Sequence, residues 1–158
     1  MSSAPTTFGI WHVVPSLEMA NTLSSRSLIG RLGIEFTDVD EGSLTARMPV
    51  DPRTHQPAGV LHGGASVVLA ETLASWAATF TVDRGTASCL GMEINANHLR
   101  PVTSGWVTGV ARPVALGRRT QVWEIRITDE ADSLVCISRC TIAVLPQAQP
   151  TRGLGGAS

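Results

Sequence analysis

The sequence predicts an α+β protein in which a curved antiparallel sheet wraps around one long central helix. Residues 65–82 form an apolar stretch whose one ionisable side chain is Glu71, and a helix that is apolar nearly all round is normally buried. Two strand-like segments precede this stretch, and four follow it with short turns that favour antiparallel pairing. One sheet buries one such helix most simply by curling around it.

The residues before the central helix divide into three parts. Residues 1–33 form an expected N-terminal leader, which is loose over residues 1–15 and then has a short helical region. Residues 34–48 are predicted to form a β-hairpin, because Asp40-Glu41-Gly42 supplies a turn in its middle. Residues 49–59 are rich in residues that interrupt helices and strands, so they are expected to form a loop.

The central helix is predicted over residues 63–83, where Asp83-Arg84-Gly85 ends it. Four strands are expected at residues 88–99, 105–114, 120–129 and 135–145, joined by turns at residues 101–104, 115–119 and 130–133. In the third of these strands, Trp123, Ile125 and Ile127 alternate with polar residues, which is the period of a half-buried strand. The folded domain is therefore expected to span residues 34–146, and the Gly-, Pro- and Gln-rich residues 147–158 are expected to be disordered.

Composition excludes several classes of function. The 158 residues suit one domain, and a net charge of −1 argues against nucleic-acid binding, which needs many phosphate contacts. All 12 basic residues are Arg, so a lysine Schiff base and a lysine-containing P-loop are excluded.

Location and metal binding can be judged from the same sequence. No membrane span and no signal peptide is apparent. The odd set of three cysteines, Cys89, Cys136 and Cys140, suggests reduced thiols in the cytoplasm. Cys136 and Cys140 share one strand face and are expected to pack in the core. Because no histidine pair has zinc-ligand spacing, no metal site is expected.

The start of the central helix has the features of an active site. The run His62-Gly63-Gly64 lies directly before its apolar part, where backbone N–H groups are free and the helix dipole is positive. Glu71 follows two turns later, and a buried carboxylate is costly unless it is paired or takes part in chemistry. This combination of an anion-stabilising helix start and a buried acid indicates an enzyme.

Several segments at consistent spacing resemble the hotdog-fold acyl-CoA thioesterases. The resemblance covers residues 34–145 and rests on Gln56, the run from Leu61 to Glu71, the run from Gly91 to Arg100, Gly117-Arg118 and Gln121-Val122-Trp123. It is greatest for the branch that acts on 4-hydroxybenzoyl-CoA (Arthrobacter type) or 1,4-dihydroxy-2-naphthoyl-CoA, or that proofreads enterobactin synthesis. The resemblance implies a hotdog fold and thioester hydrolysis.

The same resemblance implies the catalytic residues. Glu71 would be the nucleophile or general base, and the Gly63 N–H would stabilise the oxyanion. His62 and Gln56 would lie near the thioester carbonyl, and Ser75 would orient the water or the carboxylate. Four of them have a structural alternative. Glu71 could be an acid satisfied by a partner chain, and His62 a helix cap. Gln56 could be an ordinary loop glutamine, and Ser75 a small helix residue.

Coenzyme A needs cations for its phosphates and a slot for its pantetheine arm, and Arg suits phosphate through its bidentate fork. The residues that the resemblance assigns to CoA or acyl binding are Val68, Gly91, His98, Leu99, Arg100, Pro101, Ala115, Leu116, Gly117, Arg118, Arg119 and Thr120. Solvated charges in turns are the alternative for the arginines. Pro101 and Arg119 depart from the pattern expected in this branch. Val67, Leu61 and Trp76 are further candidates for the acyl pocket, and a place in the core is the alternative for Trp76.

Geometry predicts that two chains share each site. Gly63 and Glu71 are eight residues apart, which is about 12 Å along one helix. A reacting carbonyl must lie roughly 3 Å from each of them. We therefore expect Gly63 of one subunit to meet the partner subunit's Glu71 in a homodimer, and the resemblance implies a homotetramer.

The prediction from sequence is an enzyme that hydrolyses aromatic, hydroxyaryl acyl-CoA to the acid and CoA. It requires no cofactor, since CoA is part of the substrate, and no nucleic acid or membrane. Three alternatives remain: a proofreading thioesterase for mis-acylated carrier protein, a hydratase of enoyl thioesters, and a non-catalytic acyl-CoA-binding protein. The hydratase pattern is not seen here, and the leader is too short for the DNA-binding domain of a regulator.

Overall fold

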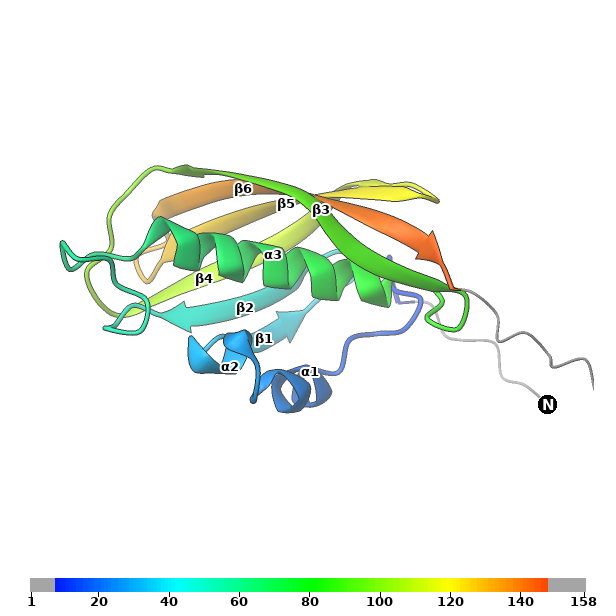
Figure 1. The fold of residues 1–158 in the computed structure, drawn as a ribbon, viewed down its shortest axis with the longest axis horizontal. Helices are drawn as coiled ribbons and strands as arrows, with labels where there is room; N and C mark the ends of the chain where they lie inside the picture. The colour runs from blue at the N-terminus through cyan, green and yellow to red at the C-terminus, as the bar shows by residue number, and fades with distance from the viewer. Residues whose placement is uncertain (1–7, 148–158) are drawn as a thin grey trace, which may run out of the picture.

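A computed structural model describes residues 8–147 (Figure 1). Its elements are α1 (Leu17–Ser24), α2 (Leu28–Arg31), β1 (Glu35–Val39), β2 (Leu44–Pro49), α3 (Gly63–Phe80), β3 (Ala87–His98), β4 (Trp106–Leu116), β5 (Thr120–Asp129) and β6 (Leu134–Pro146). The disorder expected for residues 147–158 lies outside the described residues, apart from Gln147, whose N–H donates to the Thr86 carbonyl.

The six strands form one antiparallel sheet in the order β1-β2-β4-β5-β6-β3. Figure 1 shows this sheet curving over α3, so the predicted arrangement of a sheet wrapped around one helix is confirmed. The alternation predicted for β5 is also confirmed, because Trp123, Ile125 and Ile127 are fully buried. Their side chains face α3 and, together with its inward face, form the core.

α3 is shorter than predicted and is only partly buried. It ends at Phe80 rather than at residue 83. The Thr81 N–H closes the last turn on the Ala78 carbonyl, and the N–H groups of His12 and Val13 donate to the Phe80 carbonyl. The two contacts from the N-terminal segment satisfy the Phe80 carbonyl, which a longer helix would have used. No local pattern in residues 80–83 reveals them.

The expectation of a loose leader is wrong for residues 8–15, while residues 1–7 lie outside the described part of the chain. Trp11 is only 1% exposed and belongs to the same core as the sheet. Its Nε1 donates to the Asp40 carbonyl at 2.6 Å, and the Ile10 N–H donates to the Glu41 carbonyl. One buried aromatic residue in a segment without periodicity leaves no signal for a pattern-based prediction.

The two edges of the sheet are treated differently. Beside β1, Asn21 of α1 bonds both the N–H and the carbonyl of Phe36, which covers that edge. β3 forms the other edge, and Leu90 and Met92 on it are 58% and 65% exposed. The β3 edge is therefore the open one in a single chain.

Candidate active site

The start of α3 leaves one backbone donor free. His62 has an extended backbone (φ −71°, ψ 130°), and its Nδ1 accepts the Gly64 N–H at 2.8 Å as the helix N-cap. The Ala65 N–H donates to the His62 carbonyl. Within residues 8–147 the Gly63 N–H has no acceptor. Several free N–H groups were expected at this helix start, and the Gly63 N–H is the one that the neighbouring residues leave unbonded. The helix dipole adds positive potential at that point, which suits a developing oxyanion.

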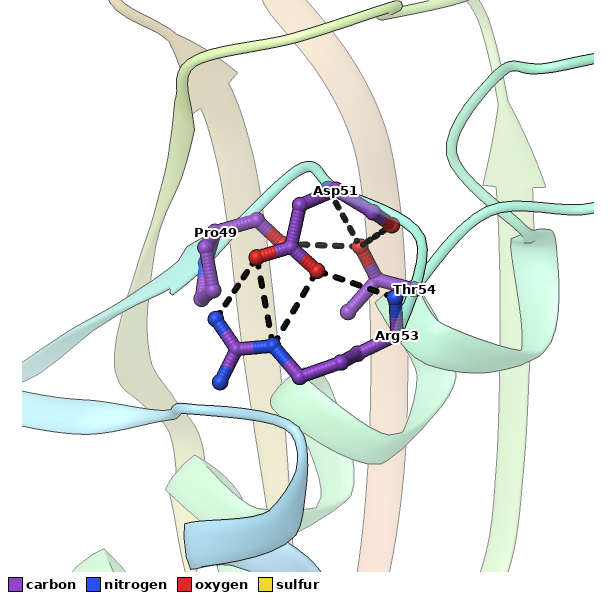
Figure 2. Close-up of polar contacts among 4 residues, drawn as sticks. All are labelled: Pro49, Asp51, Arg53 and Thr54. Atoms are coloured by element: carbon purple, nitrogen blue, oxygen red, sulfur yellow. Dashed lines mark hydrogen bonds and ion pairs between the residues drawn. The ribbon is translucent and has the colours of Figure 1, made fainter.

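The loop before α3 is tied down at its base (Figure 2). The Thr54 hydroxyl donates to the Pro49 carbonyl at 2.8 Å, and the Asp51 carboxylate accepts from the side chain and N–H of Arg53. Those hydrogen bonds hold the pKa of Asp51 below its ordinary value. The Thr54 carbonyl accepts the His62 N–H at 2.8 Å, so the anchored loop sets the direction in which the helix starts.

A cavity of about 370 Å³, here called the N-terminal cavity, lies beside this helix start. Its lining includes seven predicted site residues: Gln56, Leu61, Gly63, His98, Leu99, Arg100 and Pro101. Contact is close, because a methyl group on Gly63 would lie 2.8 Å from His98 Nε2. Gln56 is held in the turn by its Oε1, which accepts the Ala58 N–H. Ser66, which was not predicted from the sequence, also lines the cavity. Its position one helical turn beyond Gly63 could have indicated that it lies on the same face.

Glu71 is exposed in the single chain, so the prediction of a buried acid is wrong at this level. The sheet covers the opposite face of α3, and the open face also carries the partly exposed Val67, Val68 and Ser75. The carboxylate lies over Gly91 of β3, where a methyl group would come within 2.8 Å of Glu71 Oε1. The strand pairing shifts between Gly91 and Glu93, as at a β-bulge, and bulges commonly adjust strands beside active sites.

Two of the three cysteines lie in the core. Cys136 and Cys140 are fully buried, as predicted for core residues, and all three cysteines are free. Burial, followed by the nearby Glu71 and Glu93 carboxylates, raises the pKa of Cys140 to about 12. A thiol with such a pKa stays protonated at neutral pH.

Two predicted groups of CoA-binding residues lie at opposite ends of α3. His98 to Pro101 lie beside its N-terminus, whereas Gly117 and Arg118 line a hollow with Thr81 and Asp83 past its C-terminus. The helix has 18 residues and is about 27 Å long. One chain therefore does not bring the two groups together.

The predicted β4–β5 turn is shorter than expected. Ala115 and Leu116 belong to β4, paired with β5, instead of to the turn, and Thr120 begins β5. The turn proper is Gly117-Arg118-Arg119. The sequence pattern predicts that this strand ends close to Pro113. Instead, the pairing of β4 with β5 shifts between Pro113 and Ala115, and the strand continues past the proline.

Two kinds of feature were sought in the described part of the chain: clusters of metal ligands and helices able to span a membrane. No group of three His, Cys, Asp or Glu side chains in residues 8–147 is placed to hold a metal ion. In the same residues, no helix has both the length and the apolar character needed to cross a membrane.

Comparison with known proteins gives the family. The Thioesterase superfamily model matches residues 58–136. A crystal structure of a mutant of thioesterase PA1618 from Pseudomonas aeruginosa superposes with a TM-score of 0.87 and 51% identity, covering 88% of this chain and 100% of that one. The 1,4-dihydroxy-2-naphthoyl-CoA hydrolase of Escherichia coli is 47% identical over 86% of this chain and 99% of that protein. The proofreading thioesterase EntH of Cronobacter turicensis is 48% identical over 86% of this chain and 98% of that protein.

These likenesses extend over nearly the whole folded part of the chain, including α3 with both halves of the candidate site. The fold and the kind of enzyme predicted from sequence are thereby confirmed. The chain belongs to the Thioesterase superfamily, has the hotdog fold and is a thioester hydrolase.

Proposed function

We propose that this enzyme hydrolyses aromatic, hydroxyaryl acyl-CoA thioesters to the free acid and CoA, in sites shared by two subunits. The observation that carries the proposal is a free Gly63 N–H at a capped helix start, with Glu71 on the open face of the same helix. An oxyanion donor and a carboxylate are the two groups that thioester hydrolysis needs.

The spacing of these two groups supports a shared site. Eight residues separate them, which is about 12 Å along α3, so one thioester carbonyl cannot meet both in one chain. In a two-fold dimer with antiparallel helices, Gly63 of one subunit faces the partner subunit's Glu71. The open β3 edge and the exposed Leu90 and Met92 supply a surface for this pairing.

The same pairing explains the separated CoA-binding residues. His98 to Pro101 lie at one end of α3 and the β4–β5 turn lies at the other. Antiparallel helices bring opposite ends side by side, so Arg118 and Arg119 of one subunit approach the partner's N-terminal cavity. Two arginines there would provide bidentate donors for the CoA phosphates. A cytoplasmic homotetramer, built as a pair of such dimers, completes the proposal.

In the proposed reaction, Glu71 either removes a proton from the water that attacks the thioester carbonyl, or itself attacks that carbonyl to form an acyl anhydride. In the second case water then hydrolyses the anhydride, which releases the acid and restores the carboxylate. The carbonyl oxygen becomes an oxyanion that accepts the Gly63 N–H, and the C–S bond then breaks to release CoA thiolate. Water supplies the oxygen of the acid and the proton that the thiolate takes up. His62 orients Gly63, Gln56 contacts the region of the carbonyl, and Ser75 orients the water. No cofactor is required, because CoA enters as part of the substrate.

The likeness to a 1,4-dihydroxy-2-naphthoyl-CoA hydrolase supports an aromatic acyl group. The similar likeness to a proofreading thioesterase favours a second candidate, in which the acyl group is carried by a carrier protein. The two candidates share the chemistry at Glu71 and differ in what holds the acyl group.

The test is thiol release from a panel of acyl-CoA and acyl carrier protein thioesters, aliphatic and aromatic. The wild type, Glu71→Ala and the control Glu18→Ala, an exposed acid in α1, are compared. We expect aryl-CoA turnover that Glu71→Ala lowers by about 10³-fold or more, with Glu18→Ala unchanged. Faster turnover of the carrier-protein thioesters would favour the second candidate. No turnover of any thioester would contradict the proposal and favour a binding protein.

A further inference from the structure

Two hollows meet near the C-terminal end of α3. The first, of about 260 Å³, is lined by Leu23, Ser75, Trp76, Thr79, Phe80 and Arg84 and is here called the α1–α3 hollow. Leu23 belongs to α1, and four of the other lining residues belong to the C-terminal half of α3. The second hollow, of about 560 Å³, also contains Thr79 and Arg84 and continues along the start of β3 to Cys89. Thr79 and Arg84 therefore lie where the two hollows meet.

The α1–α3 hollow is continuous with the proposed catalytic face. Glu71, Ser75 and Thr79 are spaced four residues apart, so they lie in line on one face of α3. Each step is about 6 Å along the helix axis. Ser75 is one turn from Glu71 and itself lines the hollow. An acyl group held at Glu71 by its carbonyl carbon can thus extend into the hollow.

The floor of the hollow suits a flat apolar group. The Trp76 ring stacks on Phe80 with centroids 5.8 Å apart, and its other neighbour, Phe36, has its centroid at 5.3 Å. These two contacts fix the indole, and a fixed aromatic surface favours an aryl group packed against it. Thr79 adds little as a donor, because its hydroxyl already donates to the Ser75 carbonyl at 2.8 Å.

Arg84 supplies the polar end of the hollow. It is the one charged residue among the described residues that line either hollow. It is exposed, and none of the ion pairs within residues 8–147 involves it. A guanidinium stays charged at all physiological pH values and offers five N–H donors with no acceptor. Its natural partner at this place is an oxygen atom carried by the ligand.

We infer that Arg84 determines specificity by donating hydrogen bonds to an oxygen at the far edge of the acyl group. The inference rests on the proposed function and adds a substrate class: a fused or extended aryl acyl group that is apolar along Trp76 and ends in a phenolic hydroxyl or a carboxylate. An aryl group without that oxygen fits the same hollow but leaves the guanidinium without a ligand contact.

The test uses three CoA thioesters that differ only at the far edge: 2-naphthoyl, 6-hydroxy-2-naphthoyl and 6-carboxy-2-naphthoyl. Wild type, Arg84→Met and the matched control Arg31→Met, at the exposed end of α2, are assayed for kcat and KM. Arg84→Met should lower kcat/KM for at least one oxygen-bearing substrate by about tenfold or more, mostly through KM, and leave 2-naphthoyl-CoA within about twofold. Arg31→Met should change none of them.

The outcomes separate this inference from the proposed function. Equal losses on all three substrates, or no loss on any, would overturn the role of Arg84, as would be found if a second copy of the chain filled the hollow. Hydrolysis by the wild type would still support the proposed function in that case. If the wild type hydrolyses no aryl-CoA, both proposals fail. A larger loss for the carboxylate than for the hydroxyl would show that Arg84 binds an anionic edge.

Discussion

The start and the middle of α3 are held in place by different means. At the start, the chain itself supplies the cap through His62, the anchor through Thr54 and the close packing of His98 on Gly63. In the middle, Glu71 is exposed and lies over the open edge strand at Gly91. The comparison indicates that the backbone half of the site is complete in one chain, whereas the carboxylate half has no enclosing surface without a second copy.

The difference has a simple physical basis. A capped helix start fixes its own N–H groups, because the extended residue before it and the first helical residue set their direction. A carboxylate, in contrast, depends on the surface that covers it and removes water from it. A dimer would bring these two unlike halves together, so changes to either half should have different effects.

After loss of the Glu71 carboxylate, the largest expected effect comes from removing the backbone N–H at the helix start. Gly63→Pro deletes the N–H, and proline is well tolerated at the first position of a helix. The extended backbone of His62 is the conformation that a residue before proline prefers. We expect kcat for aryl-CoA to fall by about 10²–10³-fold, as for loss of an oxyanion donor, with the thermal unfolding midpoint little changed.

Gly63→Ala is the matched control for Gly63→Pro. Its methyl group meets His98 just as the proline ring does, yet it keeps the N–H. If both variants lose the same activity, crowding against His98 explains the loss and Gly63 is not the oxyanion donor. Activity that survives in Gly63→Ala and not in Gly63→Pro assigns the role to the N–H itself.

Mixed dimers are expected to show a smaller change in activity, and this change tests the shared site directly. Gly63→Pro and Glu71→Ala chains carrying different affinity tags are coexpressed, and dimers with both tags are purified. If each site uses Gly63 of one subunit and the partner subunit's Glu71, one of the two sites is intact, and about half of the wild-type activity returns. Sites built within one chain would remain inactive in every dimer, and that result would contradict the shared site.

The sequence was sufficient for those parts of the fold that have a periodic pattern. Trp123, Ile125 and Ile127 alternate as a strand must, and the apolar run around Glu71 marks the helix that the sheet encloses. The capped start of α3 was equally visible, because His62-Gly63-Gly64 combines a capping residue with small residues at a helix start. Local chemistry of this kind depends on neighbouring residues alone, so the amino-acid sequence carries it in full.

Features that depend on distant contacts were not predictable in the same way. Trp11 is buried only because the turn at Asp40 and the end of α3 come together around its segment. The exposure of Glu71 depends on which face of α3 the sheet leaves open. From the sequence, Arg84 was interpreted as part of the turn that ends the central helix. Only the structure shows that it lines the same hollow as Trp76 and Leu23. None of these has a period or a spacing of its own.

The smallest expected effect concerns His62, where a cap and a contact with substrate make different predictions. His62→Ala removes the acceptor for the Gly64 N–H and should lower the free energy of unfolding by about 1 kcal/mol, measured by denaturant titration. His62→Asn keeps a side-chain acceptor and should restore most of that stability. If His62 acts by orienting Gly63, kcat should recover with stability in His62→Asn. A stable His62→Asn enzyme that is as slow as His62→Ala would instead mean that the imidazole itself contacts the thioester.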